Sequence, residues 1–339
     1  MPLEARFNKG DSFSEIKIVE VPKPTIKEDN EILVRYVLNP INPSDLWSIR
    51  GAYPGFRPKS YPAIPGLEGM GVVDAVGKSV DSVQIGQRVI ITERSRYTSG
   101  TWRDYVVLKQ TDVIPVPDNI SDETAAQAIV NPVTAYAMLD EVDIPKGEYL
   151  LQTAGASVIG RIIIQFAKVR GVKTISLVRR KEQIEELKAI GADEVLCTED
   201  GTNIYKEVKR ITNGKFAYGA FDSVGGELGI RIAQSVRDNG HIFLYGALDG
   251  LTVTTSTHAL LFRNVHYNGF WLTKFLREAG REKVLNTFMN VFELLGNGIT
   301  PLAGKKFPLE KLSEALEYSE KEARGGKVLL THNTKPSKL

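Results

Sequence analysis

The sequence predicts an α/β protein in which a doubly wound parallel sheet is joined to a second, β-rich domain. Three observations support this fold class. A strand, a glycine-containing turn, a helix and a second strand follow one another over residues 149–178. Strands and helices alternate over about residues 122–265 as a whole, which is typical of a parallel sheet. Residues 1 to about 125 contain short β-like runs separated by Pro and Gly.

The β-rich domain is predicted from short apolar stretches with strand character. They are Glu15–Val21, Glu31–Leu38, Gly71–Val76, Gln87–Ile91 and Trp102–Val107. A compact, barrel-like arrangement would bury one face of each stretch. From Ser121 the pattern becomes helical, because Ser121-Asp122-Glu123-Thr124 resembles a helix cap followed by an alanine-rich run. We therefore place the first domain boundary between residues 121 and 122.

The segment after residue 148 predicts a βαβ unit with a binding turn. Its parts are a buried strand at Tyr149–Gln152, a turn at Gly155–Gly160, an amphipathic helix at Arg161–Arg170 and a second strand at Lys173–Val178. Such a turn lets a pyrophosphate approach the backbone amides at the positive end of the helix. Ser157 replaces the middle glycine of the dinucleotide-binding pattern, so a tight turn in another kind of α/β protein is the alternative.

The end of the second strand carries three cations, Arg179, Arg180 and Lys181. NAD enzymes place an acidic residue about 20 residues after the turn, where it binds the ribose 2′-hydroxyl. A carboxylate there would repel a 2′-phosphate, whereas guanidinium groups bind it with charge-assisted hydrogen bonds. The sequence therefore favours NADPH over NADH. A solvated basic start to the next helix is the alternative.

The rest of the chain continues the alternation and then returns. The predicted elements are helices at Lys181–Ile190, Ile204–Thr212 and Gly229–Val236, strands at Ala217–Ser223 and Gly240–Gly246, helices near Lys274–Leu295 and Leu309–Ser319, and a last strand at Lys327–Thr331. We assign residues 122–265 to the NADPH-binding domain. Residues 266–339 are expected to pack back on the first domain.

Composition excludes several other classes of protein. The chain has 339 residues, 42% of them hydrophobic and 25% charged, as in ordinary soluble proteins. A net charge of +2, with no basic run carrying aromatics, gives no indication of nucleic-acid binding. No apolar stretch reaches membrane-spanning length and no signal peptide is evident, so we expect a cytoplasmic protein. The single cysteine, Cys197, is predicted to be a buried, unreactive thiol, with neither a disulfide nor a Cys-based zinc site.

The order of these domains resembles the medium-chain dehydrogenase/reductase family, in which a GroES-like domain is combined with a Rossmann domain. The segments that carry the resemblance are Pro65–Val73, Val76–Val80, Gly86–Val89 and Gly326–Leu329. Zinc members of that family have Cys near the position of Asn42 and His at that of Leu67, and both ligands are absent here. Glu68 remains, but one carboxylate does not hold zinc tetrahedrally. We expect no metal, which argues against alcohol dehydrogenation and leaves reduction of a double bond conjugated to a carbonyl.

Within the zinc-free members, three stretches resemble the mitochondrial-type 2-enoyl thioester reductases. They are Ile41–Pro54, Asn131–Tyr136 and Gly269–Leu272. Quinone reductases carry something similar to the first stretch, and the third could also be an aromatic core strand. The resemblance implies that Tyr53 is the proton donor or oxyanion stabiliser, since a neutral phenol donates well. It also implies that Asn42 and Thr134 belong to the catalytic site.

The same resemblance implies the contacts of NADPH and the partners of the protein. The cofactor contacts are Asn131, Gly155, Ala156, Ser157, Val158, Ile159, Gly160, Arg179, Arg180, Lys181, Tyr245, Gly246, Ala247, Leu248, Phe270, Trp271, Leu272 and Lys327. The expected substrate is a trans-2-enoyl thioester of CoA or an acyl carrier protein, and the expected assembly is a homodimer. The alternatives are an NADPH:quinone reductase and a non-catalytic NADPH-binding protein.

Overall fold

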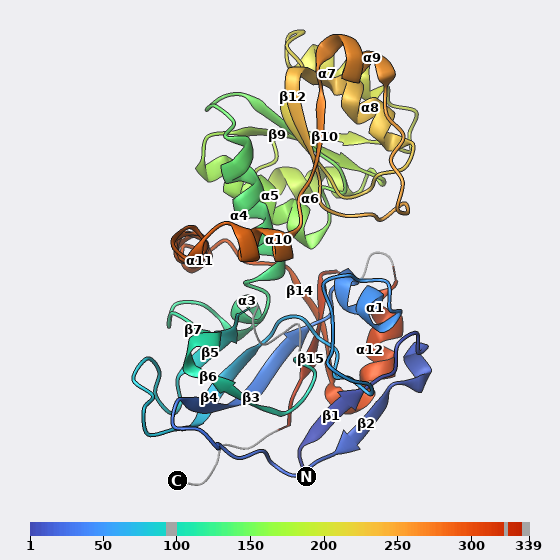
Figure 1. The fold of residues 1–339 in the computed structure, drawn as a ribbon. Helices are drawn as coiled ribbons and strands as arrows, with labels where there is room; N and C mark the ends of the chain where they lie inside the picture. Colours follow the sequence, from blue (N-terminus) through green and yellow to red (C-terminus); the bar gives the residue numbers. More distant parts are fainter. Residues whose placement is uncertain (93–99, 322–324, 334–339) are drawn as a thin grey trace. The chain divides into compact units, whose positions relative to one another are not determined.

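The computed structural model describes residues 1–92, 100–321 and 325–333 and divides into two compact units (Figure 1). Unit 1 comprises Met1–Val130 together with the chain from Leu295 onward, and unit 2 comprises Asn131–Leu294. These limits differ from the expected ones at 121/122 and 265/266. Residues 122–130 stay with the β-rich unit, and residues 266–294 stay with the parallel sheet.

Unit 2 contains a six-stranded parallel sheet. Its strands are β8 (Tyr149–Gln152), β9 (Lys173–Val178), β10 (Glu194–Cys197), β11 (Ala217–Asp222), β12 (Val236–Leu244) and β13 (His266–Gly269). They lie in the order β10-β9-β8-β11-β12-β13, and all pairs are parallel. This is the doubly wound order 3-2-1-4-5-6, in which ligands bind outside the carboxyl ends of the strands next to the point where the order reverses, here between β8 and β11.

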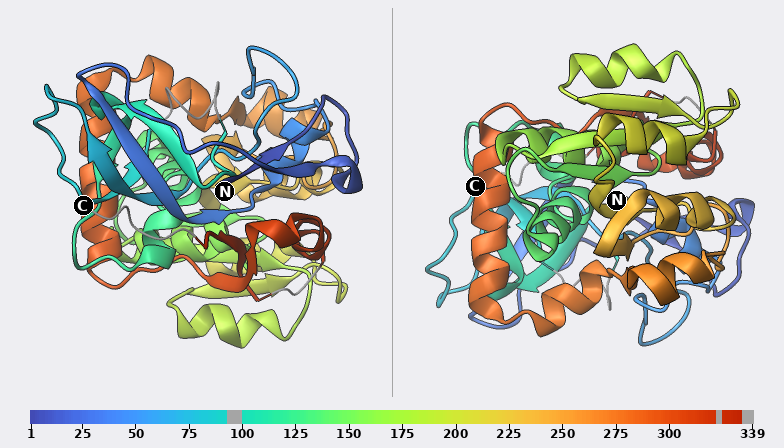
Figure 2. Two further views of the ribbon diagram at one scale, coloured as in Figure 1. Left: turned by 90° about the horizontal axis from the view of Figure 1, so that it is seen from below. Right: turned by 90° about the horizontal axis from the view of Figure 1, so that it is seen from above.

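Helices cover both faces of this sheet, as the predicted doubly wound fold requires. Those of unit 2 are α4 (Val130–Val142), α5 (Val158–Val169), α6 (Gln183–Ala189), α7 (Ile204–Ile211), α8 (Leu228–Ser235), α9 (Thr257–Arg263), α10 (Leu272–Glu278) and α11 (Arg281–Gly296), the long orange helix in the right-hand view of Figure 2. Apolar residues of α7, α8 and α9 share one core with Leu151 and Ile175. On the other face, α5 and α6 pack around Val178.

Unit 1 is built on a seven-stranded sheet to which both ends of the chain contribute. Its strands are β3 (Glu31–Pro40), β4 (Met70–Val76), β5 (Arg88–Ile91), β6 (Tyr105–Lys109), β7 (Val113–Pro115), β14 (Ala303–Pro308) and β15 (Lys327–Thr331), and a separate pair is formed by β1 (Leu3–Arg6) and β2 (Lys17–Glu20). The order is β14-β15-β3-β4-β5-β7, with β6 also paired to β3. The closing strand β15 lies antiparallel to β3, with Leu330 opposite Asn39.

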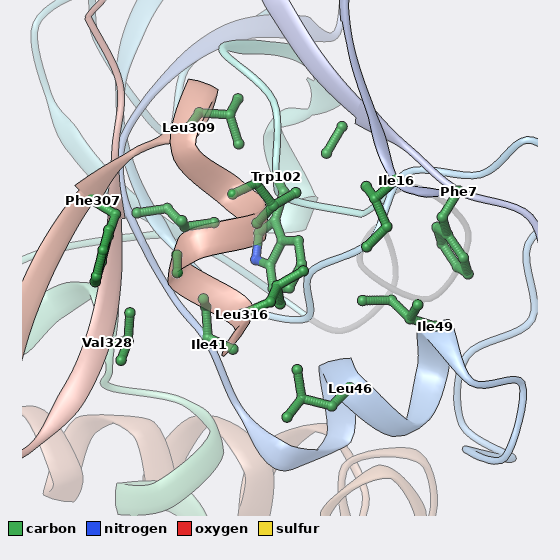
Figure 3. Packing of buried hydrophobic residues seen from close by; sticks show 14 of the residues in the cluster. Phe7, Ile16, Ile41, Leu46, Ile49, Trp102, Phe307, Leu309, Leu316 and Val328 are labelled. Carbon is green, nitrogen blue, oxygen red and sulfur yellow. The ribbon is translucent and has the colours of Figure 1, made fainter. Parts of the chain in front are cut away.

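The core of unit 1 likewise joins residues from the beginning and the end of the chain. Trp102 is fully buried at its centre (Figure 3). Ile41, just before the helix α1 (Pro43–Ile49), and Ile49, the last residue of that helix, pack there with Leu316 of α12 (Leu312–Ser319). Burial of one large apolar side chain stabilises a fold by about 1.5–3 kcal/mol, so this shared core holds the two ends together.

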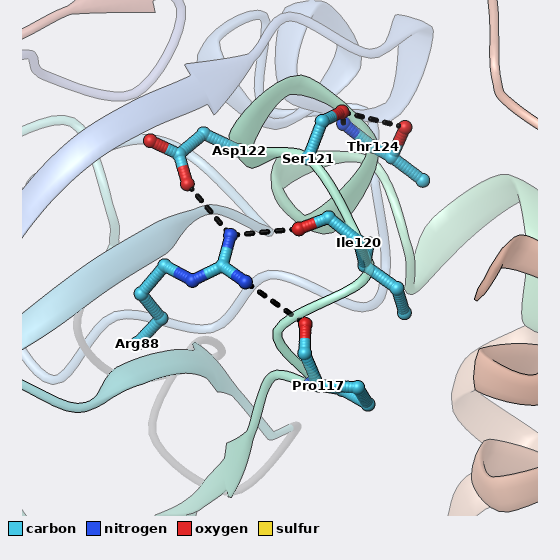
Figure 4. A network of polar contacts seen from close by, with 6 residues as sticks. All are labelled: Arg88, Pro117, Ile120, Ser121, Asp122 and Thr124. Atoms are coloured by element: carbon cyan, nitrogen blue, oxygen red, sulfur yellow. Dashed lines mark hydrogen bonds and ion pairs between the residues drawn. The ribbon is translucent and has the colours of Figure 1, made fainter.

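The connection from β7 to α3 (Asp122–Ala126) is fixed by Arg88, the first residue of β5. Its guanidinium donates to the carbonyl oxygens of Pro117 and Ile120 and to a carboxylate oxygen of Asp122, at 2.7–2.9 Å (Figure 4). The hydroxyl of Ser121 accepts from the backbone N–H of Thr124 at 3.2 Å, which confirms the predicted helix cap. These contacts explain why residues 117–126 remain part of unit 1.

Several predicted boundaries shift by a few residues. Helix α5 begins at Val158 rather than at Arg161, so the last three residues of the predicted turn are helical. The helix expected near Lys274–Leu295 is two helices, α10 and α11, which Gly280 separates with φ +81°. The short helix α1, which follows Asn42 and begins at Pro43, was not predicted. In the described part of the chain, no helix is both long and apolar enough to cross a membrane.

Candidate active site

The turn between β8 and α5 depends on two glycines at which a side chain would not fit. A Cβ atom on Gly155 would lie 2.8 Å from Cβ of Ser176, and one on Gly160 would lie 2.6 Å from the carbonyl oxygen of Gly155. Atoms at such distances overlap, so both positions require glycine. Close packing of the helix on the turn is the role of the last glycine in dinucleotide-binding turns.

Ser157, at the position of the missing middle glycine, starts helix α5. Its φ of −67° is open to any residue, and its hydroxyl accepts from the backbone N–H of Gly160 at 3.1 Å. The serine therefore caps the helix without requiring the conformational freedom of glycine. Helix α5 has twelve residues, and its positive N-terminus lies at the carboxyl edge of the sheet. The turn thus retains the features that attract a phosphate group.

The three cations follow β9, the strand next to β8, so they lie at the same edge of the sheet. The side chain of Arg179 is exposed, and its carbonyl oxygen accepts from the buried thiol of Cys197 at 3.1 Å. The ammonium of Lys181 lies 3.5 Å from a carboxylate oxygen of Asp200. Cys197 is thus buried, as the sequence predicted. Its hydrogen bond to the carbonyl oxygen of Arg179 fixes the backbone from which the Arg179 side chain projects.

The other predicted cofactor contacts of unit 2 lie at the ends of strands or on α4. Tyr245–Leu248 follow β12 directly, and the backbone N–H of Phe270, just after β13, donates to the carbonyl oxygen of Leu244 at 2.8 Å. The stretch Phe270–Leu272 is therefore not a core strand, since Trp271 precedes α10 and Leu272 begins it. Asn131 and Thr134 are both buried and lie three residues apart on α4, hence on one face of that helix.

In unit 1, a buried chain of polar groups connects Lys327, Asn42 and Glu68. The ammonium of Lys327 donates to Oδ1 of Asn42 at 2.7 Å, and Nδ2 of Asn42 donates to Oε1 of Glu68 at 2.7 Å. The other oxygen of Glu68 accepts from the backbone N–H of Val130 at 2.9 Å. All three side chains are at least 95% buried. A buried carboxylate and a buried ammonium are tolerable here because hydrogen bonds compensate for lost water.

The same chain of polar groups shows that the residues at this place do not fit a zinc ion. The oxygen of Asn42 already accepts from an ammonium group, whose charge would repel a cation. An amide and a carboxylate without a thiolate or imidazole are also a poor donor set for tetrahedral zinc. Across residues 1–92, 100–321 and 325–333, no three His, Cys, Asp or Glu side chains come together in a way that would hold a metal.

Asp45, on α1, is the buried neighbour of this network. One of its carboxylate oxygens accepts from the backbone N–H of Asn42 at 2.7 Å, and the side chain is fully buried. Burial raises the pKa of the Asp45 carboxyl to about 7, and the negative charge of Glu68 acts in the same direction. The hydrogen bond from Asn42 and the charge of Lys327 oppose the rise. Asp45 is therefore expected to change protonation near neutral pH.

We expect Asp45→Asn to remove a pH dependence of folding stability. An unfolded Asp ionises near pH 4, whereas folded Asp45 holds its proton up to about pH 7. Its stabilising contribution is thus complete below about pH 4 and is lost as the pH rises to 7. The rise from about 4 to about 7 corresponds to roughly 4 kcal/mol at most. The free energy of unfolding of D45N, relative to that of wild type, should therefore increase by up to this amount between pH 4 and pH 8. Urea unfolding of both proteins across this pH range measures the difference in the free energy of unfolding. A difference that does not change with pH would contradict the raised pKa of Asp45.

Tyr53 lies in the loop after α1 and is half-buried at the edge of the core of unit 1. Its backbone N–H donates to the carbonyl oxygen of Trp47 at 3.2 Å, and its own carbonyl oxygen accepts from Phe56 at 3.3 Å. The loop is thus anchored on both sides of the tyrosine. Unit 1 contains three predicted site residues, Tyr53, Asn42 and Lys327, the last two in direct contact.

Sequence reasoning missed two features of these sites. Asp45 was overlooked, although an acidic residue three positions after Asn42 and two after a proline is a signal of a helix start. The second is a hydrogen bond between Thr153, which follows β8, and Asp222, which ends β11. Only the pairing of β8 with β11 brings these two residues together, and the sequence pattern does not give the order of the strands.

Comparison with known proteins assigns both halves of the chain. Residues 28–118 match the model of the alcohol dehydrogenase GroES-like domain, and residues 158–290 match that of the zinc-binding dehydrogenases. A mitochondrial enoyl-[acyl-carrier-protein] reductase of Caenorhabditis elegans is 35% identical over 72% of this chain and 70% of its own length. The enzyme of that name from Arabidopsis thaliana is 34% identical over 91% of this chain and 82% of its own length.

Solved structures with the same fold include enoyl thioester and quinone reductases. A Bacillus thuringiensis protein provisionally assigned as an NADPH:quinone reductase has 33% identity and a TM-score of 0.87, over 97% of this chain and 98% of its own. The complex of Etr1p, a Candida tropicalis protein, with NADP and crotonyl-CoA has 25% identity and a TM-score of 0.87, over 97% and 99%. The Escherichia coli quinone oxidoreductase in complex with NADPH has 25% identity and a TM-score of 0.83, over 97% of this chain and 99% of its own.

The domain matches, the identity to these relatives and the shared fold agree with the glycine turn and the strand order described above. The chain belongs to the medium-chain dehydrogenase/reductase family of oxidoreductases.

Proposed function

We propose that this protein is an NADPH-dependent, zinc-independent reductase of a carbon–carbon double bond conjugated to a carbonyl, and that its substrate is a trans-2-enoyl thioester of CoA or an acyl carrier protein. The observation that carries the proposal is the cationic end of β9 beside the glycine turn, in a chain 34–35% identical to enoyl-[acyl-carrier-protein] reductases.

The residues of unit 2 fit NADPH. Gly155 and Gly160 keep the turn free of side chains, and the N-terminus of α5 offers backbone N–H groups to a pyrophosphate. Arg179 and Arg180 supply the positive charge that a 2′-phosphate requires. Bound NADPH supplies a hydride for the reduction.

The remaining steps belong to the side chains of the protein. Reducing the double bond adds a hydride to the β-carbon of the enoyl group and a proton to its α-carbon. Negative charge develops on the thioester oxygen in between, and a fixed hydrogen-bond donor lowers the energy of that state. The hydroxyl of Tyr53 is proposed as this donor and as the source of the proton. Asn42, held by Lys327 and Glu68, is proposed as a further member of the catalytic site.

Reduction of a quinone is the second candidate function. It is favoured by one observation, the TM-scores of 0.87 and 0.83 to the Bacillus thuringiensis and Escherichia coli structures, which equal or approach that of the thioester reductase. The two functions share the NADPH site and differ in the acceptor of the hydride.

Steady-state oxidation of NADPH distinguishes the two. We expect fast turnover with crotonyl-CoA or hexenoyl-CoA and slow turnover with 1,4-benzoquinone, followed at 340 nm. NADH is the control for cofactor choice, and we expect it to be used poorly. Turnover with the quinone alone would replace the thioester proposal with the second candidate. Turnover with neither acceptor, together with tight NADPH binding, would indicate a non-catalytic protein.

A further inference from the structure

Two buried side chains meet below the carboxyl edge of the unit 2 sheet, Thr153 after β8 and Asp222 at the end of β11. The strands run parallel with Gln152 opposite Phe221, and the backbone N–H of Thr153 extends this pairing by donating to the carbonyl oxygen of Phe221 at 3.0 Å. The hydroxyl of Thr153 donates to Oδ1 of Asp222 at 2.8 Å. Both residues are 0% exposed.

The Asp222 carboxylate organises the backbone that follows it. The same oxygen, Oδ1, also accepts from the backbone N–H groups of Val224 at 2.9 Å and Gly225 at 3.2 Å. The hydroxyl of Thr153 in turn accepts from the backbone N–H of Ser223 at 2.9 Å. The pair therefore satisfies three consecutive N–H groups of the turn at residues 223–225, and without it the N–H groups of the buried residues Ser223 and Gly225 would lack these partners.

This turn holds the segment that follows β12. The backbone N–H of Leu248 donates to the carbonyl oxygen of Ser223 at 3.0 Å, and that of Tyr245 donates to the carbonyl oxygen of Asp222 at 3.0 Å. Gly246 packs so closely that a Cβ atom there would lie 2.8 Å from the carbonyl oxygen of Ser223. A displacement of the turn would consequently displace residues 245–248 as well.

Strand order indicates which part of a dinucleotide this segment serves. The glycine turn follows the central strand β8, and the arginines follow β9 on one side of it. If the pyrophosphate binds at the turn and the 2′-phosphoadenosine half binds at Arg179 and Arg180, the nicotinamide half must extend toward the opposite side, over β11 and β12. Residues 245–248 lie at that end of the edge.

We propose that Thr153 and Asp222 are positioning residues that fix residues 245–248 for the nicotinamide half of NADPH. Neither side chain needs to contact the cofactor. The inference rests on the proposed function, because it takes NADPH as the ligand, and it adds a distinction between the two halves of the cofactor that can be measured in binding alone.

The test compares NADPH with 2′,5′-ADP, a fragment that carries only the 2′-phosphoadenosine half, by isothermal titration calorimetry. Thr153→Val keeps the shape of the side chain but removes its hydroxyl. We expect T153V to weaken the binding of NADPH at least tenfold, while its affinity for 2′,5′-ADP changes less than twofold. Thr153→Ser keeps the hydroxyl and should restore NADPH affinity to within threefold of wild type. Asp222→Asn provides the same comparison if T153V does not fold.

The outcomes separate this inference from the proposed function. Equal weakening of NADPH and 2′,5′-ADP in T153V would indicate a general loss of structure and overturn the positioning role. Wild-type affinity of T153V for NADPH would overturn it too, and in both cases the NADPH site itself stands. A wild-type protein that binds neither ligand would overturn the proposed cofactor and the inference with it.

Discussion

Replacing Tyr53 with Phe is expected to lower kcat for an enoyl thioester by about 10²-fold or more, the usual effect of losing a general acid or oxyanion donor. The substitution removes one hydroxyl and keeps the ring that packs against the unit 1 core. The Kd for NADPH should stay within about twofold, because the proposed cofactor contacts of unit 2 are untouched. Stopped-flow single turnover and fluorescence titration measure the two quantities separately.

Tyr61→Phe is the matched control for this prediction. Tyr61 belongs to the same stretch of chain between α1 and β4, and its ring packs edge-on against that of Phe7, with 5.8 Å between the ring centroids. Its hydroxyl has no proposed part in the reaction. Y61F should keep the turnover of wild type. If Y53F also keeps it, Tyr53 is a packing residue of the loop and the proton has another source.

Replacing both Arg179 and Arg180 by Ser is expected to weaken the binding of NADPH by about 10²-fold and to change the affinity for NADH by less than about threefold. Each charge-assisted hydrogen bond to the 2′-phosphate contributes about 1.5–3 kcal/mol, and 1.4 kcal/mol corresponds to a factor of ten in affinity. NADH lacks this phosphate, so its binding depends on the turn and on the other half of the site. Titration of both cofactors against the double variant gives the two changes.

Lys188→Ser provides the control for the effect of charge alone. Lys188 is an exposed cation of α6 whose ammonium lies 3.7 Å from Glu185, and it has no proposed contact with the cofactor. Its loss should change the affinity for NADPH by less than about twofold at 0.15 M salt, where distant surface charges are largely screened. Parallel losses for NADPH and NADH in the arginine double variant would mean that the pair does not read the 2′-phosphate.

Local patterns predicted several strands of both sheets well, and the limits of helices and domains less well. Three strands are confirmed residue for residue: Tyr149–Gln152 and Lys173–Val178 in the parallel sheet, and Lys327–Thr331 in the sheet of unit 1. Val236 was predicted as helical, but α8 ends at Ser235 and β12 begins at the next residue, with no connecting loop to mark the change. The assignment of residues 266–294 depended on β13 pairing with β12, a contact between distant segments that no local pattern reports.

The candidate site shows the same division. Ser157 was recognised as a departure from the glycine pattern, and its role as a helix cap follows from a local rule. The contact between Asn42 and Lys327 joins residues 285 positions apart, and it exists only because β15 returns to pair with β3. Burial of this kind also sets the pKa of Asp45, which has nothing unusual in its sequence neighbours. Site chemistry that depends on the tertiary fold is therefore what the sequence leaves open.

The division of unit 1 between the two ends of the chain has a consequence for biosynthesis. A ribosome synthesises the whole of unit 2, residues 131–294, before it makes β14, α12 and β15. Until then, β3 in the first 130 residues lacks its partner strand β15, and Trp102 lacks its core neighbour Leu316. Domains fold as units during synthesis, so the inserted unit is the first to be complete although it starts later. The nascent N-terminal segment thus needs protection from aggregation until the strands and the helix that complete unit 1 have been made.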